Sequence, residues 1–203
     1  MQPIESAIDV HGEAFAKNRA YMEGYVAKVR KVEQNQLATE LGYKSRARDK
    51  GKLLPRERLA RLLDPGAPFL ELCSIAGYGM FDDSDGSTSG GKLIAGIGFV
   101  SGRRCLVIVW NFAIAGGTID SVNVKKMLRL QRIAFEMRLP VVSLHESGGG
   151  NLAKSSAMMD PWGAALFTEG GTIYGQQAEL SAAGIPQITV SHGNATAGGA
   201  YQV

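Results

Sequence analysis

The chain has 203 residues, 45% of them hydrophobic, and a formal net charge of +3 at pH 7, which predicts about one domain with its own core. No apolar run approaches the ~20 residues of a membrane-spanning helix, and the N-terminus lacks the basic-then-apolar pattern of a signal peptide, so we expect a cytoplasmic protein with no membrane partner. The two cysteines, Cys73 and Cys105, form no C-x-x-C motif, which predicts neither a disulfide framework nor a metal site.

The positive charge is concentrated near the N-terminus. Residues 17–61 hold 13 Lys/Arg against 5 Asp/Glu, whereas residues 62–203 hold 9 against 11. A solvated helix followed by a basic connector is one explanation, and contact with coenzyme phosphates or with a partner subunit is the other. We expect no nucleic-acid partner.

The first predicted element is a helix over residues 13–40. Its apolar positions recur at helical intervals and are Phe15, Met22, Val26 and Val29,. Gly42 suits the end of this helix, and a basic connector follows it. A second, short helix begins at Pro55, which is tolerated in a first turn.

The pattern then changes to alternating strands and helices. Strands are predicted at 69–76, 92–100, 103–114, 140–147 and 186–193, with an amphipathic helix at 124–139, helical or mixed segments at 151–159 and 170–184, and a polar loop at 84–91. From about residue 104 this order is typical of β-α crossover units with parallel strands. We therefore predict an α/β fold, with a helical and basic extension at residues 1–63 and the main domain at 64–203.

Two glycine-rich loops follow buried strands, in HESGGG (145–150) and TAGGAY (196–201). Ligands approach parallel sheets at the carboxyl ends of the strands, and bare backbone N–H groups at such ends attract anions. Gly148, Gly149 and Gly150, with Gly198 and Gly199, are therefore candidate donors for a negatively charged oxygen. No phosphate-binding loop motif is present, whereas an enolate formed from a thioester would need only such donors.

Candidate side-chain chemistry near the first loop leaves alternatives open. Ser147 lacks a full G-x-S-x-G motif, so a catalytic triad with His145 or His192 is weakly supported. Glu146 is either a carboxylate that orients the loop or a general base.

Three motifs in order resemble the carboxyltransferase (beta) subunits of biotin-dependent acyl-CoA carboxylases. They are GKLLPRERLARLLD (51–64), AGGTIDSVNVKKMLRLQRIA (115–134), and the pair SGGG (147–150) and AGGA (197–200). The resemblance covers roughly residues 10–203, and it is nearer to the branch that acts on branched or unsaturated acyl-CoAs.

The resemblance implies a crotonase-like spiral of ββα units and transfer of a carboxyl group from carboxybiotin to the α or vinylogous γ carbon of an acyl-CoA enolate. The loop of Gly148, Gly149 and Gly150 would polarise the thioester carbonyl, and Ala197, Gly198, Gly199 and Ala200 would line the wall that faces biotin. The substrate side would also include Gly116 and Gly117, and Lys125 or Lys126 would meet a CoA phosphate. Biotin would arrive on a biotin carboxylase or biotin carboxyl carrier partner, and the full-length protein would be a homo-oligomer, in the mitochondrial matrix if eukaryotic.

This sequence departs from the family pattern in two respects. Gly150 stands where the family usually has alanine, and nothing in the chain matches the second, related domain, so we expect a domain truncated at its C-terminus. Two other functions stay open: a crotonase-type enoyl-CoA hydratase or isomerase with Glu146 or Glu169 as its base, and a non-catalytic fragment that binds acyl-CoA.

Overall fold

The computed structural model describes residues 6–80, 83–151 and 161–203, and for 161–167 it describes the backbone only. Its centre is a five-stranded sheet in the order β1-β2-β3-β4-β5. The strands are β1 (Leu70–Glu71), β2 (Leu93–Val100), β3 (Arg103–Trp110), β4 (Val141–Ser147) and β5 (Gln187–Ala195). The first three strands pair antiparallel, and β3, β4 and β5 pair parallel, which confirms the predicted parallel arrangement.

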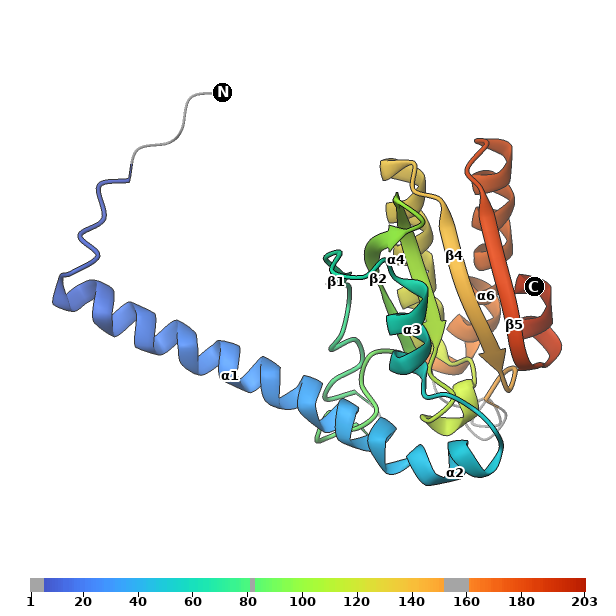
Figure 1. Cartoon of the computed structure of the whole chain (residues 1–203), viewed down its shortest axis with the longest axis horizontal. Helices are drawn as coiled ribbons and strands as arrows, with labels where there is room; N and C mark the ends of the chain where they lie inside the picture. Colours follow the sequence, from blue (N-terminus) through green and yellow to red (C-terminus); the bar gives the residue numbers. More distant parts are fainter. Residues whose placement is uncertain (1–5, 81–82, 152–160) are drawn as a thin grey trace.

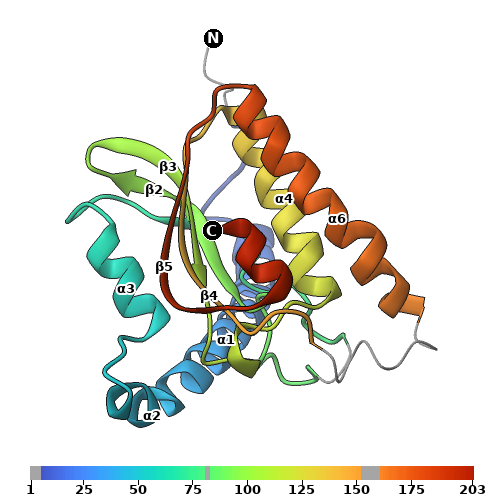
Figure 2. The same cartoon turned by 90° about the vertical axis from the view of Figure 1, so that its right-hand side faces the viewer.

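Helices cover both faces of the sheet. The two long crossover helices, α4 (Ser121–Met137) and α6 (Pro161–Ala182), lie on one side, and α3 (Pro55–Leu62) lies on the other (Figure 2). Alternate residues of β3 therefore enter two cores: Leu106 and Ile108 pack toward α4 and α6, whereas Val107 packs on the side of α3. Burial on both faces explains why β3 reads as a continuous apolar run.

Two predicted segments differ from the structure. The strand expected at 69–76 is reduced to the two residues of β1, because Cys73 has a φ of 54°, a left-handed conformation that a strand cannot contain. The segment expected to be helical or mixed at 151–159 lies, apart from Asn151, outside the described residues. The division of the chain at residue 63 stays a prediction, although Leu59 of α3 belongs to the core of the sheet.

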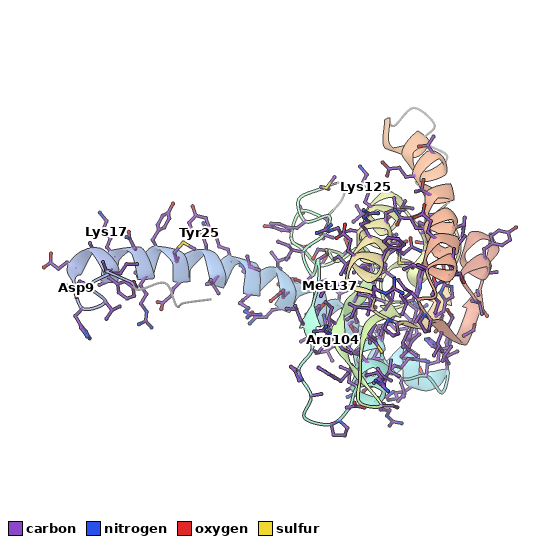
Figure 3. All side chains as sticks on the ribbon, turned by 90° about the horizontal axis from the view of Figure 1, so that it is seen from above. Asp9, Lys17, Tyr25, Arg104, Lys125 and Met137 are labelled. Atoms are coloured by element: carbon purple, nitrogen blue, oxygen red, sulfur yellow. The ribbon has the colours of Figure 1, made fainter. Side chains whose placement is uncertain are left out.

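The N-terminal helix α1 (Glu13–Gly42) begins where predicted and ends two residues later than predicted, and most of it projects away from the domain (Figure 1). Its buried residues, Val32, Gln36 and Glu40, all belong to the C-terminal part. The predicted apolar positions Met22 and Val26 are 58% and 53% exposed, and Figure 3 shows Lys17 and Tyr25 on this projecting part. The periodicity thus predicts the helix correctly, but this chain alone does not bury the apolar stripe.

The basic connector contains the short helix α2 (Lys44–Asp49), and the motif at 51–64 ties it to the sheet. The Arg56 guanidinium donates two hydrogen bonds to Glu71, at 2.8 and 3.0 Å, and the Arg56 backbone N–H donates to Glu40 at 2.9 Å. At the end of the motif, Asp64 accepts from the backbone N–H groups of Ser101 and Gly102 in the β2–β3 turn. The motif is therefore a structural connection between α1, β1 and the central hairpin.

We predict that Arg56→Met lowers the free energy of unfolding by about 3–5 kcal/mol, because it leaves the buried Glu40 carboxylate and Glu71 without their cation. Urea unfolding followed by circular dichroism measures this difference. Arg61→Met, at an exposed position of the same helix, is the matched control and should change stability by less than about 0.5 kcal/mol. Equal effects of the two variants would contradict the assignment.

Candidate active site

Three glycine-containing loops meet at the carboxyl ends of the parallel strands. The short helix η1 (Ala115–Gly117) follows β3, residues 147–150 follow β4, and the short helix η2 (Ala197–Gln202) follows β5. Because β3, β4 and β5 run parallel, their ends share one edge of the sheet, as predicted for the two loops after β4 and β5.

Ser147 joins all three loops. Its hydroxyl donates to the Gly117 carbonyl at 3.1 Å and accepts from the Gly149 N–H at 3.1 Å, and its own carbonyl accepts from the Thr196 N–H at 3.2 Å. The side chain is buried. This bridging role is not evident in the sequence, where Ser147 is read only as a weak candidate nucleophile.

The hydrogen bonds of the first loop correct the predicted set of oxyanion donors. The Gly148 N–H donates to the Gly116 carbonyl at 3.2 Å, and the Gly149 N–H is held by Ser147. Both amides are therefore occupied internally. Gly150 forms a parallel bridge with Ile119 through its two neighbours. The Ile119 N–H donates to the Gly149 carbonyl, and the Asn151 N–H donates to the Ile119 carbonyl. The N–H of Gly150 itself has no acceptor among the described residues.

Close contact between the loops explains several of the glycines. A Cβ on Gly149, which has a φ of 77°, would lie 2.9 Å from the Thr196 carbonyl, and one on Gly199 would lie 2.8 Å from the Ser147 hydroxyl. A Cβ on Gly117 would lie 2.7 Å from the Glu146 carbonyl. Gly150, by contrast, has open space beside it. We expected these glycines to let a ligand come close to the backbone. At these three glycines the close neighbour is instead another loop of the same chain.

Only some of the predicted residues of the second loop, 197–200, are exposed to solvent. Ala197 and Ala200 are exposed, Gly198 is half-buried and Gly199 is buried. The Gly198 carbonyl accepts from the Tyr174 hydroxyl at 2.8 Å. The first N–H groups of η2, those of Ala197 and Gly198, have no carbonyl partner within the helix.

The structure does not assemble a serine triad from the described residues. The Ser147 hydroxyl bonds to backbone groups, and His145 is fully buried beside Trp110, with neither ring nitrogen hydrogen-bonded. Burial and the neighbouring His192 lower the pKa of His145 to about 4. At neutral pH His145 is therefore an uncharged core residue.

Glu146 is held between Lys52 and His192. Lys52 Nζ, from the motif at 51–64, donates to one carboxylate oxygen, and His192 Nδ1 lies 3.3 Å from the other. Burial raises the pKa of Glu146, but the bonds to His192 and Lys52 outweigh it, and the pKa is lowered. These contacts favour the orienting role over the general base. The part played by Lys52 was missed, since the sequence places it 94 residues away.

The two predicted lysines occupy different environments. Lys126 is buried, donates to the carbonyls of Cys73, Gly90 and Leu93 at 2.7–3.1 Å, and has a pKa lowered to about 8 by burial. It supports the loop before β2, and its ammonium group is engaged by these three carbonyls. Lys125 is exposed on α4 (Figure 3) and lines a cavity of about 250 Å³ together with Arg129.

That cavity adjoins a second one of about 270 Å³, which extends to the glycine loops. The two share Ala76, Gly77, Met80 and Val122 as lining residues. The second also reaches Ala115 of η1 and Asn151, which follows the first loop. No helix in the described part of the chain is long and apolar enough to cross a membrane. Within the described ranges, no three His, Cys, Asp or Glu side chains gather as a metal site would require.

Comparisons with known proteins agree with this geometry. The family model of the carboxyl transferase domain matches residues 46–203. The biotin-dependent 3-methylcrotonyl-coenzyme A carboxylase beta1 subunit of Mycobacterium tuberculosis is 44% identical over 168 residues, which are 81% of this chain and 30% of that protein. The mitochondrial methylcrotonoyl-CoA carboxylase beta chain of Arabidopsis thaliana is 39% identical over 200 residues, or 98% of this chain and 32% of that protein.

A solved structure matches still more closely. The beta subunit of P. aeruginosa geranyl-CoA carboxylase superposes with a TM-score of 0.85 and 52% sequence identity, over 98% of this chain and 36% of that one. The chain thus belongs to the carboxyl transferase domain family, with the crotonase-like α/β fold preceded by an N-terminal helix. Within that family its homologues include beta subunits of biotin-dependent acyl-CoA carboxylases, and it spans about a third of their length.

We predict that Gly149→Ala lowers the free energy of unfolding by about 1–3 kcal/mol, because alanine at a φ of 77° is strained and its Cβ meets the Thr196 carbonyl,. Gly150→Ala is the matched control, since nothing lies within 4 Å of its Cβ position, and it should be nearly neutral. Urea unfolding of both variants distinguishes them. Similar stabilities would show that the loops are not packed as described.

A second prediction concerns acid stability. Because the pKa of His145 is about 4 when folded and about 6.5 when unfolded, its neutral form stabilises the fold above pH 6.5, and this contribution is lost as the pH falls toward 4. His145→Phe should keep the contact with Trp110 and lose less stability over that range than the parent chain.

Unfolding free energies measured between pH 7 and 4 provide this comparison. His11→Gln, at an exposed position, is the control and should follow the parent curve. A His145→Phe curve that fell as steeply as the parent would contradict the buried, neutral histidine.

Proposed function

We propose that the polypeptide carrying this chain transfers a carboxyl group from carboxybiotin to an acyl-CoA, and that this chain supplies part of the acyl-CoA side of the site. The observation that supports this most directly is the Gly150 N–H, which has no acceptor among the described residues and belongs to a glycine with open space at its Cβ position. A thioester that loses an α or γ proton places its negative charge on the former carbonyl oxygen. A preorganised N–H aimed at that oxygen contributes about 2.7–4 kcal/mol in the transition state.

Each loop has a separate role in this proposal. Gly148 and Gly149 no longer count as donors, since their N–H groups fix the loop to η1 and to Ser147. Their bonds keep Gly150 in place, and Gly116 and Gly117 serve as the acceptors that complete the support. Lys125, at the mouth of the cavity that it lines with Arg129, is the residue we propose for a CoA phosphate.

Biotin, when bound, supplies a carboxyl group in transferable form. On this chain the exposed surfaces of Ala197 and Ala200 suit contact with a flat heterocycle, and the N–H groups that open η2, which have no partner within that helix, suit its polar edge. Gly198 and Gly199, which are less exposed, would support this surface from its inner side. We propose that a separate biotin carboxylase or biotin carboxyl carrier partner brings the group, and that the complete protein is a homo-oligomer.

The acyl group that we propose is methyl-branched and unsaturated. The relatives at 52% and 44% identity are named for geranyl-CoA and 3-methylcrotonyl-CoA, and such chains extend the enolate to a vinylogous γ carbon. The hydratase or isomerase alternative is less well supported, because Glu146 is occupied by Lys52 and His192. For Glu169, on α6, no bond to either glycine loop is found among the described contacts.

The test compares Gly150→Pro with Gly150→Ala in the polypeptide that contains this chain, assembled with its biotin-bearing partner. Proline removes the N–H, whereas alanine keeps it and adds one methyl group. We expect Gly150→Pro to lower kcat for 3-methylcrotonyl-CoA by about 10²–10³-fold, with Gly150→Ala much closer to the parent.

The assay also includes acetyl-CoA and an enoyl-CoA hydration measurement. Equal losses in the two variants would show that steric change, not the N–H, matters. Acyl-CoA binding by the parent without any carboxyl transfer would favour the non-catalytic fragment, and hydration activity that depended on Glu146 would favour the crotonase-type enzyme.

A further inference from the structure

The carboxylate of Glu146 occupies a prepared position at the end of β4. Between His145 and Ser147, β4 advances by two residues while β5 advances by four, from Ser191 to Ala195. The extra residues of β5 form a bulge opposite Glu146, and a bulge of this kind redirects a strand. The bulge therefore sets the direction in which β5 leaves the sheet and enters the loop at 196–199.

A glycine in the bulge makes room for the carboxylate. A Cβ at Gly193 would overlap the carboxyl carbon and an oxygen of Glu146. His192, from the same bulge, places Nδ1 3.3 Å from Glu146 Oε2. The side chain of Glu146 thus fills the space that the bulge creates and lies beside His192 of the same bulge.

The opposite side of the carboxylate is held by the basic connector. Lys52 Nζ donates to Glu146 Oε1 and also lies 5.5 Å from the centre of the Phe112 ring. The guanidinium carbon of Arg58, on α3, lies 5.7 Å from the centre of the same ring, and Arg58 adds positive charge near Glu146. The connector, the strand end and the bulge are therefore joined through one buried carboxylate, whose side chain is only 10% exposed.

The position of this bulge affects the two loops of the candidate site. Directly after the bulge, the Thr196 N–H donates to the Ser147 carbonyl at 3.2 Å, and Gly199 packs against Ser147. If the β5 bulge could move, the distances from Thr196 and Gly199 to Ser147 would vary with it. Such loops hold their geometry only when supporting residues fix them.

We propose that Glu146 is a positioning residue: held by Lys52 and His192, it fixes the β5 bulge and thereby the separation of the 147–150 and 196–199 loops. The inference assigns a function to Lys52 of the motif at 51–64. The inference deepens the proposed function, and the expected effect of Glu146 on acyl-CoA binding rests on that function. The geometry of the loops, however, can be measured without any substrate.

The experiment uses the 203-residue chain with Glu146→Gln, Glu146→Asp and the control Glu136→Gln, an exposed glutamate on α4. Hydrogen exchange measured by NMR reports on the Thr196 N–H, and calorimetry reports on 3-methylcrotonyl-CoA binding. We expect Glu146→Gln to speed exchange at Thr196 and weaken binding, each by about tenfold. Glu146→Asp should recover part of both effects, and Glu136→Gln should match the parent.

A second variant covers the case in which Glu146→Gln does not fold. Lys52→Met should raise Thr196 exchange in the same direction. Where Glu146→Gln does fold, the double variant should add little to either single one, since both remove the same Lys52–Glu146 contact. Parent-like exchange at Thr196 in Glu146→Gln, or in Lys52→Met, would overturn the proposal.

Two further outcomes separate this inference from the proposed function. If the parent does not bind acyl-CoA but Thr196 exchange responds as expected, the proposed function fails and the positioning role stands. If Glu146→Gln leaves binding and exchange unchanged but abolishes turnover of an enoyl-CoA, Glu146 is a general base and the positioning role is overturned.

Discussion

The geometry of the candidate site depends on the hydrogen bonds of one buried serine. Ser147 uses its hydroxyl as donor to Gly117 and as acceptor from Gly149, and its carbonyl as acceptor from Thr196. Three loops that leave three parallel strands are thereby held around a single residue. Buried polar groups that are fully paired in this way are rigid, because breaking any one bond leaves an unsatisfied partner in a water-free environment.

Around this centre, buried charges attach the N-terminal segment to the sheet. Lys52 donates to Glu146, Arg56 pairs with Glu71 and Glu40, and Lys126 donates to two carbonyls before β2 and to that of its first residue. Each cation is taken from water, which costs free energy unless its partners are well placed. The basic zone noted in the sequence is therefore partly structural, although the exposed half of α1 keeps the rest of its charge available for a partner.

The fold was largely predictable because its elements have strong local patterns. The continuous apolar run of β3 and the amphipathic period of α4 predicted buried parallel strands and a covering helix. The segment around Cys73 was not predictable, since its left-handed turn depends on the packing of the loop against Lys126. The apolar stripe of α1 has the period of a buried face, yet only tertiary contact decides which part of it is covered.

For the site, the sequence by itself determined that glycine-rich loops follow two buried strands, and its ordered motifs identified the family. Only the tertiary structure decided which amide hydrogens remain unpaired. Gly148, Gly149 and Gly150 are identical in sequence terms, but Gly116 and Ser147 take the first two N–H groups and leave that of Gly150. The physical reason is that a glycine indicates where the backbone can come close, whereas its hydrogen-bond partner depends on how the chain folds, as the bond from Gly148 to the distant Gly116 shows,.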